Sequence, residues 1–216
     1  MTNSYATSWI TFFVFLSAGI GLANAELVDN GDGTVTDTDR KIMFLKDANI
    51  ANTAGLYADG RMSWQKAKSH VADLEFAGFK DWRLPKAENA DGSDICRGYN
   101  CTGSELGHLY YSELRNRPGD FQNSGPFENI QPYYYWTGTE TSSGPLTPQG
   151  AWHFMFGDDG NIRAGYQWIS NNEELNLAGF TPIRLHVWPV RDTEPRRTSW
   201  FERFRTWWAC LFSEDC

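Results

Sequence analysis

The sequence predicts a single domain of the α+β class. Two segments in its first half have the periodicity of amphipathic helices, and three later segments are rich in aromatic and β-branched residues. Helices followed by strands that can pair antiparallel, with long loops between them, are typical of this class. Hydrophobic residues make up 41% of the 216 residues, which provides for a core and argues against disorder.

Residues 1–25 are predicted to be a signal peptide that is removed on export. They contain no charged side chain, and an apolar run over residues 9–23 leads to Ala23-Asn24-Ala25, a cleavage pattern. An uncleaved anchor is the alternative, although the run is shorter than the ~20 residues of a spanning helix. No cysteine follows the run, so a lipoprotein is not expected. The mature chain is therefore expected to be periplasmic or extracellular.

The first predicted element of the mature chain is a β-hairpin over residues 27–37. Two short β-capable runs flank a pair of Asn-Gly and Asp-Gly dipeptides, which supply the positive φ angles of tight turns. A calcium loop is the alternative, since Asp29, Asp32 and Asp37 are close in sequence. The EF-hand template fails, because Val28 stands where a ligand is required four residues before Asp32.

The first helix is predicted over residues 63–76. Its apolar side chains follow the i, i+3, i+7, i+10 spacing of one helical face, and Gly78 provides a stop signal. This apolar stripe consists of Trp64, Ala67, Val71 and Leu74.

A second helix is predicted over residues 103–116. Thr102 and Glu105 have the spacing of a capping box, and an apolar stripe follows them. His108 lies within the stripe, where a lone histidine is typical of a structural or solvated residue rather than a ligand. The stripe consists of Leu106, Leu109, Tyr110 and Leu114.

Loops and strands alternate from residue 118 onward, where Pro-Gly and Ser-Gly-Pro sequences recur. Aromatic and β-branched residues predict strands over residues 133–139, 151–156 and 183–191. A turn over residues 157–161 is expected to join the middle strand to a further strand over residues 162–168.

The four cysteines are predicted to form two structural disulfides in an oxidising compartment. Three connectivities are open, and the local pairing of Cys96 with Cys101 and of Cys210 with Cys216 is favoured by their short separations. No Cys-x-x-Cys motif is present, so a metal or redox role is not expected. A disulfide that closes a loop of about six residues raises the free energy of unfolding by about 2 kcal/mol. Such a bond constrains the local loop and is not expected to hold the whole fold together.

Four segments of the chain together resemble one family. They are residues 28–37, 77–85, 135–140 and 187–191, and the second contains Asp81-Trp82-Arg83-Leu84-Pro85. In combination they are similar to the Lcl C-terminal domain, named for a bacterial collagen-like adhesin and formerly a domain of unknown function. The resemblance implies an exported protein with a C-type-lectin-like fold, in which two helices pack on twisted antiparallel strands with long loops. Because that adhesin binds sulfated glycosaminoglycans, the resemblance also implies that this chain binds a glycan or a surface polymer.

The Asp81-to-Pro85 element also has a structural interpretation of its own. Trp82 and Leu84 are expected in the core, while Arg83 is expected to pair with Asp81 or with another carboxylate. After this element the sequence departs from the family pattern, because an insertion carries the first two cysteines.

The net charge narrows the class of partner. Nineteen Lys and Arg residues against 27 Asp and Glu residues give a formal net charge of −8. Nucleic-acid binding requires a basic surface, so a nucleic-acid partner is not expected. The same acidity opposes sulfated polymers, so the particular ligand of the adhesin is not carried over to this chain.

No motif in the sequence predicts an enzyme. The nucleophile-elbow, zinc-protease and phosphate-loop patterns do not occur, and the four histidines share no metal-ligand spacing. No metal or cofactor is therefore predicted, and calcium has no supporting motif. The alternative is an enzyme or an enzyme accessory subunit related to the formylglycine-generating oxidases, which share the lectin-like fold and need reactive cysteines.

Exposed aromatic rings beside carboxylates or amides are a common means of holding sugars. The alternative for each such residue is a core ring or a solvated turn. The predicted ligand-binding residues on or beside the loops are Tyr133, Tyr134, Glu140, Asp158, Asp159, Asn161 and Trp168.

The last segment, residues 192–216, is predicted to form an amphipathic helix after a domain that spans residues 26–191. A capping box opens it and an apolar face follows. Three roles are open: docking on the domain, contact with a partner or a second copy, and binding to a membrane surface. The face consists of Trp200, Phe201, Phe204, Trp207, Trp208 and Leu211.

Overall fold

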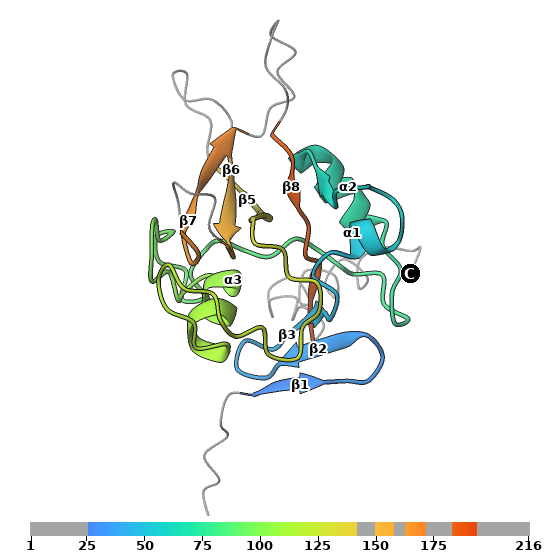
Figure 1. Ribbon diagram of the computed structural model, residues 1–216, viewed down its shortest axis with the longest axis horizontal. Helices are drawn as coiled ribbons and strands as arrows, with labels where there is room; N and C mark the ends of the chain where they lie inside the picture. The colour runs from blue at the N-terminus through green and yellow to red at the C-terminus, as the bar shows by residue number, and fades with distance from the viewer. Residues whose placement is uncertain (1–25, 142–149, 158–162, 172–182, 194–216) are drawn as a thin grey trace, which may run out of the picture.

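The computed structural model describes residues 26–141, 150–157, 163–171 and 183–193. They form two β-sheets with short helices at their edges, a mixed α and β architecture (Figure 1). The predicted signal peptide, Asp158, Asp159, Asn161, the second cysteine pair and the tail helix lie outside the described residues.

The first sheet joins the two ends of the domain. Its strand order is β1-β2-β3-β9, and every neighbouring pair is antiparallel. The strands are β1 (Leu27–Asp29), β2 (Thr34–Asp37), β3 (Ile42–Leu45) and β9 (Val190–Asp192).

The second sheet is larger and lies above the first in the view of Figure 1. Its order is β4-β8-β5-β6-β7, and only the β5–β8 pair is parallel. The strands are β4 (Arg61–Met62), β5 (Tyr134–Glu140), β6 (Gly150–Met155), β7 (Gln167–Asn171) and β8 (Leu185–His186). The helical elements are α1 (Ile50–Thr53), α2 (Trp64–Ala72), α3 (Glu105–His108) and η1 (Leu109–Glu113).

The predicted hairpin is confirmed as β1 and β2. Its aspartates serve the turn, because Asp29 Oδ1 accepts a hydrogen bond from the Gly31 amide and Asp32 Oδ1 accepts one from the Thr34 amide. These local contacts account for two of the three carboxylates that suggested a calcium loop.

The first predicted helix is confirmed as α2, but it ends at Ala72 instead of Phe76. Phe76 and Phe79 exchange two backbone hydrogen bonds across a tight turn, in which Ala77 and Gly78 have φ angles of 50° and 79°. The helix has therefore ended, with Asp73 as its C-cap, before the chain reaches this turn and the Gly78 stop signal. Trp64, Ala67 and Val71 are buried as predicted.

The second predicted helix starts and ends differently from the expectation. Its N-cap is Ser104, whose Oγ accepts a hydrogen bond from the Gly107 amide at 3.1 Å, so the capping box at Thr102 is wrong. Glu105 does not reach back to the cap because its carboxylate binds Arg83. After His108 the helix widens into a π-helical turn, with a hydrogen bond from the Leu114 amide to the Leu109 carbonyl.

The strands over residues 133–139 and 151–156 are confirmed as β5 and β6, while two other strand predictions were wrong in extent. The strand predicted over residues 162–168 begins only at Gln167, because Gly165, at a φ of 89°, turns the chain before it. Residues 183–191 do not form one strand. The chain leaves the larger sheet after His186 and enters the smaller sheet at Val190, so that Trp188 lies between the two sheets with 0% exposure.

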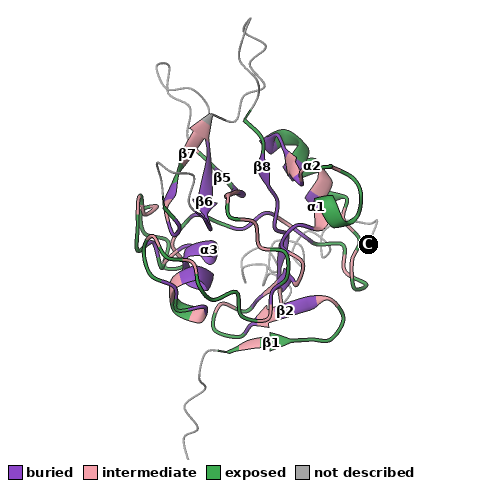
Figure 2. Cartoon of the chain, in the orientation of Figure 1, coloured by how far each residue is buried: buried purple, intermediate pink, exposed green. Residues whose placement is uncertain are grey.

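The core is largely aromatic. The largest fully buried side chains are Trp136, Trp188, Tyr110 and Tyr135, and most of the buried hydrophobic residues form one continuous cluster. Figure 2 shows this burial along β5, β6 and β8, while the loops are mostly exposed. In the part of the chain that the structure describes, no helix is long and apolar enough to cross a membrane.

Arg83 occupies a partly buried ion-pair network. Its guanidinium donates two hydrogen bonds to Glu105 at 2.8 Å each and a further one to Asp192. Trp82 and Leu84 are buried on either side, as predicted. The partner is another carboxylate rather than Asp81, which accepts hydrogen bonds from Arg191 instead.

Candidate functional site

Trp168 differs from the other tryptophans of the described residues. The described residues include six tryptophans. Five of them are at most 3% exposed, whereas Trp168 on β7 is 39% exposed. A large apolar ring left in water loses the free energy that burial would provide, so exposed aromatic clusters mark binding surfaces. The surroundings of Trp168 therefore define the candidate site.

The loop between Cys96 and Cys101 lies beside β7. The Gly98 amide donates to the Gln167 carbonyl at 2.8 Å, and the Gln167 amide donates back at 2.9 Å. This pairing places Arg97 and Tyr99 next to Trp168 and Tyr166. A short edge segment is thus added to the sheet by the insertion.

These four side chains form a surface that we call the aromatic platform, made of Arg97, Tyr99, Tyr166 and Trp168. The ring centroids of Tyr99 and Tyr166 are 5.0 Å apart, and those of Tyr166 and Trp168 are 5.8 Å apart. The Arg97 guanidinium lies 5.6 Å from the Trp168 ring centroid, within the range of a cation–π contact. Three rings and one cation are therefore held side by side.

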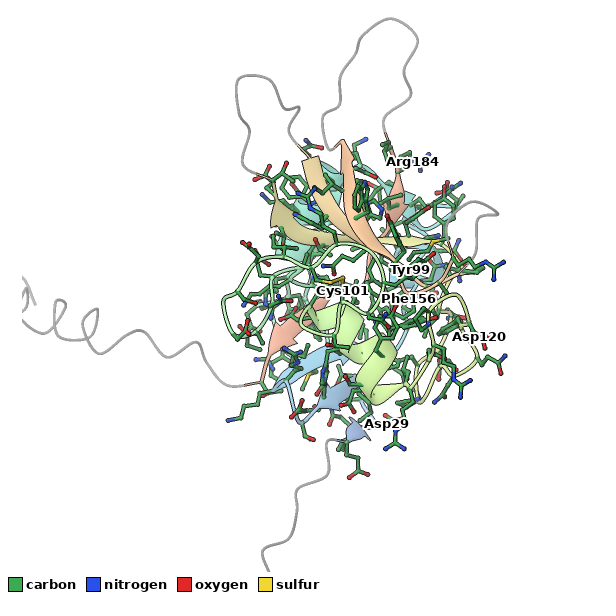
Figure 3. The ribbon with its side chains drawn as sticks, turned by 90° about the vertical axis from the view of Figure 1, so that its left-hand side faces the viewer. Asp29, Tyr99, Cys101, Asp120, Phe156 and Arg184 are labelled. Atoms are coloured by element: carbon green, nitrogen blue, oxygen red, sulfur yellow. A yellow bond between two sulfur atoms is a disulfide. The ribbon has the colours of Figure 1, made fainter. Side chains whose placement is uncertain are left out.

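The loop that carries half of the platform is fixed at both ends. A disulfide joins Cys96 to Cys101, as predicted (Figure 3). The buried Gln167 side chain donates to the Cys96 carbonyl at 2.9 Å and to the Ala87 carbonyl at 3.2 Å. Gly98 has a φ of 95°, a conformation that other residues rarely adopt, so the loop reverses at this glycine. The platform is in place before any ligand arrives.

A cavity of about 460 Å³ opens beside the same loop. Its volume lies within the usual range for small-molecule sites. The Arg40 guanidinium donates to the Thr102 carbonyl at 2.7 Å, and hydrogen bonds from Ser93 keep the pKa of Asp91 below its usual value, so this carboxylate is ionised at neutral pH. The lining side chains that can bind hydroxyl groups are Arg40, Asn89, Asp91, Asn100 and Thr102.

The structure brings few of the sequence-predicted site residues together. Trp168 belongs to the platform, whereas Tyr133 and Tyr134 are half-buried and pack on each other at 5.1 Å. The Tyr134 ring also contacts His153 at 4.8 Å, and His153 is the cross-strand partner of Trp168. Glu140 is exposed at the end of β5.

Burial determines the charge of His153. It lowers the pKa of this imidazole to about 4, so the ring is neutral at neutral pH. It therefore adds no charge beside the Tyr134 ring.

Sequence reasoning missed Arg97, Tyr99, Tyr166 and the cavity residues. The available signal was the spacing of the first cysteine pair: a disulfide that closes a short loop with an arginine and a tyrosine at its tip presents both side chains in a fixed place. What the sequence did not indicate is that this loop pairs with β7.

The disulfide provides a first test of the platform. The variant Cys96→Ser/Cys101→Ser is expected to lose about 2 kcal/mol of unfolding free energy, because the open loop gains entropy in the unfolded chain. Trypsin is expected to cleave it faster after the exposed Arg97. Urea unfolding and timed proteolysis measure both effects, with Ser69→Ala, an exposed serine on α2, as the control. Unchanged stability and unchanged cleavage would show that the loop is held without the bond.

Comparison with known proteins identifies the family. Residues 33–177, more than half of the chain, match the Lcl C-terminal domain. Searches of curated proteins and of solved structures give no match. The segments at residues 77–85 and 135–140 lie within the matched region, residues 28–37 overlap its start and residues 187–191 lie beyond its end. The chain belongs to the Lcl C-terminal domain family.

Proposed function

We propose that this chain is an exported, non-enzymatic binding module of adhesin type, with a C-type-lectin-like fold, that recognises a glycan or a surface polymer carrying one. The observation that carries the proposal is the aromatic platform with its 39% exposed Trp168, half of which stands on a disulfide-closed loop that also lines a cavity through Cys96 and Asn100. Membership of the Lcl C-terminal domain family supports the adhesin-like part of it.

The chemistry of the site suits a pyranose. A ring face of Trp168 or Tyr99 can cover the apolar face of the sugar, and the amides and carboxylate of the cavity can bind its hydroxyl groups. The disulfide keeps the platform and the cavity in register because both are built on one loop. Little ordering entropy is then lost on binding.

The alternative of an oxidase-like enzyme receives less support. That chemistry needs reactive thiols, while Cys96 and Cys101 are joined in a disulfide. The net charge of −8 supports a partner other than nucleic acid.

A glycan array probed with the purified exported protein tests the proposal. The variants Trp168→Ala and Tyr99→Ala are each expected to weaken binding to the best glycan at least tenfold, a change of about 1.4 kcal/mol, because they remove a stacking ring. Leu56→Ala is the matched control, since Leu56 is 56% exposed on a different part of the surface. Absence of binding to any glycan by the wild-type protein at high concentration would refute the proposal, and so would an equal loss in the control.

A further inference from the structure

Two carboxylates and one imidazole form a buried cluster where the smaller sheet meets α3 and η1. Asp37 ends β2, His108 ends α3 and Glu113 ends η1. One potential ligand atom from each lies within 4.8 Å of those of the other two. Their side chains are 0%, 8% and 5% exposed, respectively.

The carboxylate of Asp37 is only half satisfied. Its Oδ1 accepts a hydrogen bond from the Arg40 amide at 2.9 Å, whereas its Oδ2 has no hydrogen-bond partner among the described residues. That free oxygen lies 3.7 Å from His108 Nε2. A fully buried carboxylate oxygen without a partner is destabilising, because it has lost its water without gaining a donor.

One imidazole cannot satisfy all the oxygens that surround it. His108 Nε2 lies 3.2 Å from Glu113 Oε1, 3.3 Å from Asp39 Oδ2 and 3.7 Å from Asp37 Oδ2. It carries at most one proton, which serves one strong hydrogen bond.

The spacing fits a small divalent cation. Zinc binds imidazole nitrogen and carboxylate oxygen at about 2.0–2.2 Å in a tetrahedron, which sets the distances between ligand atoms at about 3.3–3.6 Å. The distances of 3.2 and 3.7 Å from Nε2 to the two buried carboxylates bracket that range. A nitrogen ligand favours zinc over calcium or magnesium, which prefer oxygen alone.

We propose that Asp37, His108 and Glu113 bind one Zn²⁺ ion and that the fourth position faces Asp39, the 53% exposed carboxylate on the solvent side. The ion joins the hairpin to the helical segment and gives the free oxygen of Asp37 a partner. The site lies on other residues than the aromatic platform, so it does not depend on glycan binding.

The proposal is tested by measuring zinc binding to the full chain after bound metal has been removed with a chelator and the chelator has been dialysed away. Competition with a chromophoric chelator is expected to give one tightly bound Zn²⁺ per chain, and Zn²⁺ is expected to raise the melting temperature because it binds the folded state alone. Calcium in a parallel titration is expected to bind at least a hundredfold more weakly. Calcium binding equal to or tighter than that of zinc would overturn the assignment of the metal.

Two variants test whether the ion binds to these residues. Asp37→Asn and Glu113→Gln are each expected to weaken zinc binding at least a hundredfold, while Glu128→Gln, which changes an exposed carboxylate in a surface ion pair, leaves it unchanged. Without zinc, Asp37→Asn is expected to melt no lower than the wild type, because it removes a desolvated charge and keeps the acceptor for the Arg40 amide. A zinc-free wild type that gains no stability from Zn²⁺, or variants that bind as tightly as the wild type, would refute the site.

Discussion

Replacing Arg83 by Met is expected to lower the free energy of unfolding by about 3–5 kcal/mol. The guanidinium is 18% exposed and holds Glu105 through two hydrogen bonds of 2.8 Å. Burial alone would lower the pKa of Arg83, but the hydrogen bonds and charges of Glu105 and Asp192 raise it above its usual value. Without Arg83, the Glu105 carboxylate stays in a site with 8% exposure and has lost its charge partner.

Urea unfolding measures this effect, and two further variants isolate its cause. Lys80→Met removes a surface ion pair to Glu75, whose side chains are 73% and 63% exposed, and is expected to change stability by less than about 0.5 kcal/mol. Arg83→Met combined with Glu105→Gln is expected to recover part of the loss, because no unpaired charge stays buried. A loss below about 1 kcal/mol for Arg83→Met alone would mean that water reaches Glu105.

Gly107→Ala is expected to destabilise the protein by about 3 kcal/mol, although alanine in a helix ordinarily stabilises it relative to glycine. A Cβ atom on Gly107 would lie 1.8 Å from the Cys101 carbonyl oxygen and 2.7 Å from Ser104 Oγ. The carbonyl oxygen belongs to a residue held by a disulfide, and Ser104 is the cap of the same helix. Neither neighbour can move without breaking a contact that positions the loop.

The matched control for this prediction is Gly138→Ala on β5. A Cβ atom there would lie 3.4 Å from Leu84 Cβ, near ordinary van der Waals distance, and the backbone does not have a positive φ. Thermal and urea unfolding of both variants are expected to show a change within about 0.5 kcal/mol for Gly138→Ala. Equal stability of the two variants would show that the segment before α3 yields easily.

Local features were predictable because they depend on neighbouring residues. The turn of the first hairpin is set by its Asn-Gly and Asp-Gly dipeptides, and each nearby aspartate accepts a hydrogen bond from an amide two residues on. The Cys96–Cys101 disulfide is likewise a short-range pairing. The buried stripe of α2 follows from helical periodicity alone.

The predictions that failed involve competition from distant residues. Thr102 and Glu105 have capping-box spacing, yet Arg83, 22 residues before Glu105, binds that carboxylate. Residues 183–191 have strand composition throughout, yet the chain changes sheets within them and buries Trp188 between the two sheets. The strand or helix propensity of a segment does not determine which of two possible tertiary partners it will contact in the folded chain.

The sequence by itself determined the family, the turns, the cysteine loop and the aromatic character of the core. The tertiary structure alone decided which aromatic rings stay in water and which acidic groups converge. Trp168, on the edge strand β7 of the larger sheet, is exposed, whereas Trp152, on the neighbouring strand β6, is buried. Asp37 and His108 are 71 positions apart and meet only because the hairpin packs against the second helical segment. Local conformational preferences act over a few residues, whereas a binding site requires side chains from distant segments that only the packed core brings together.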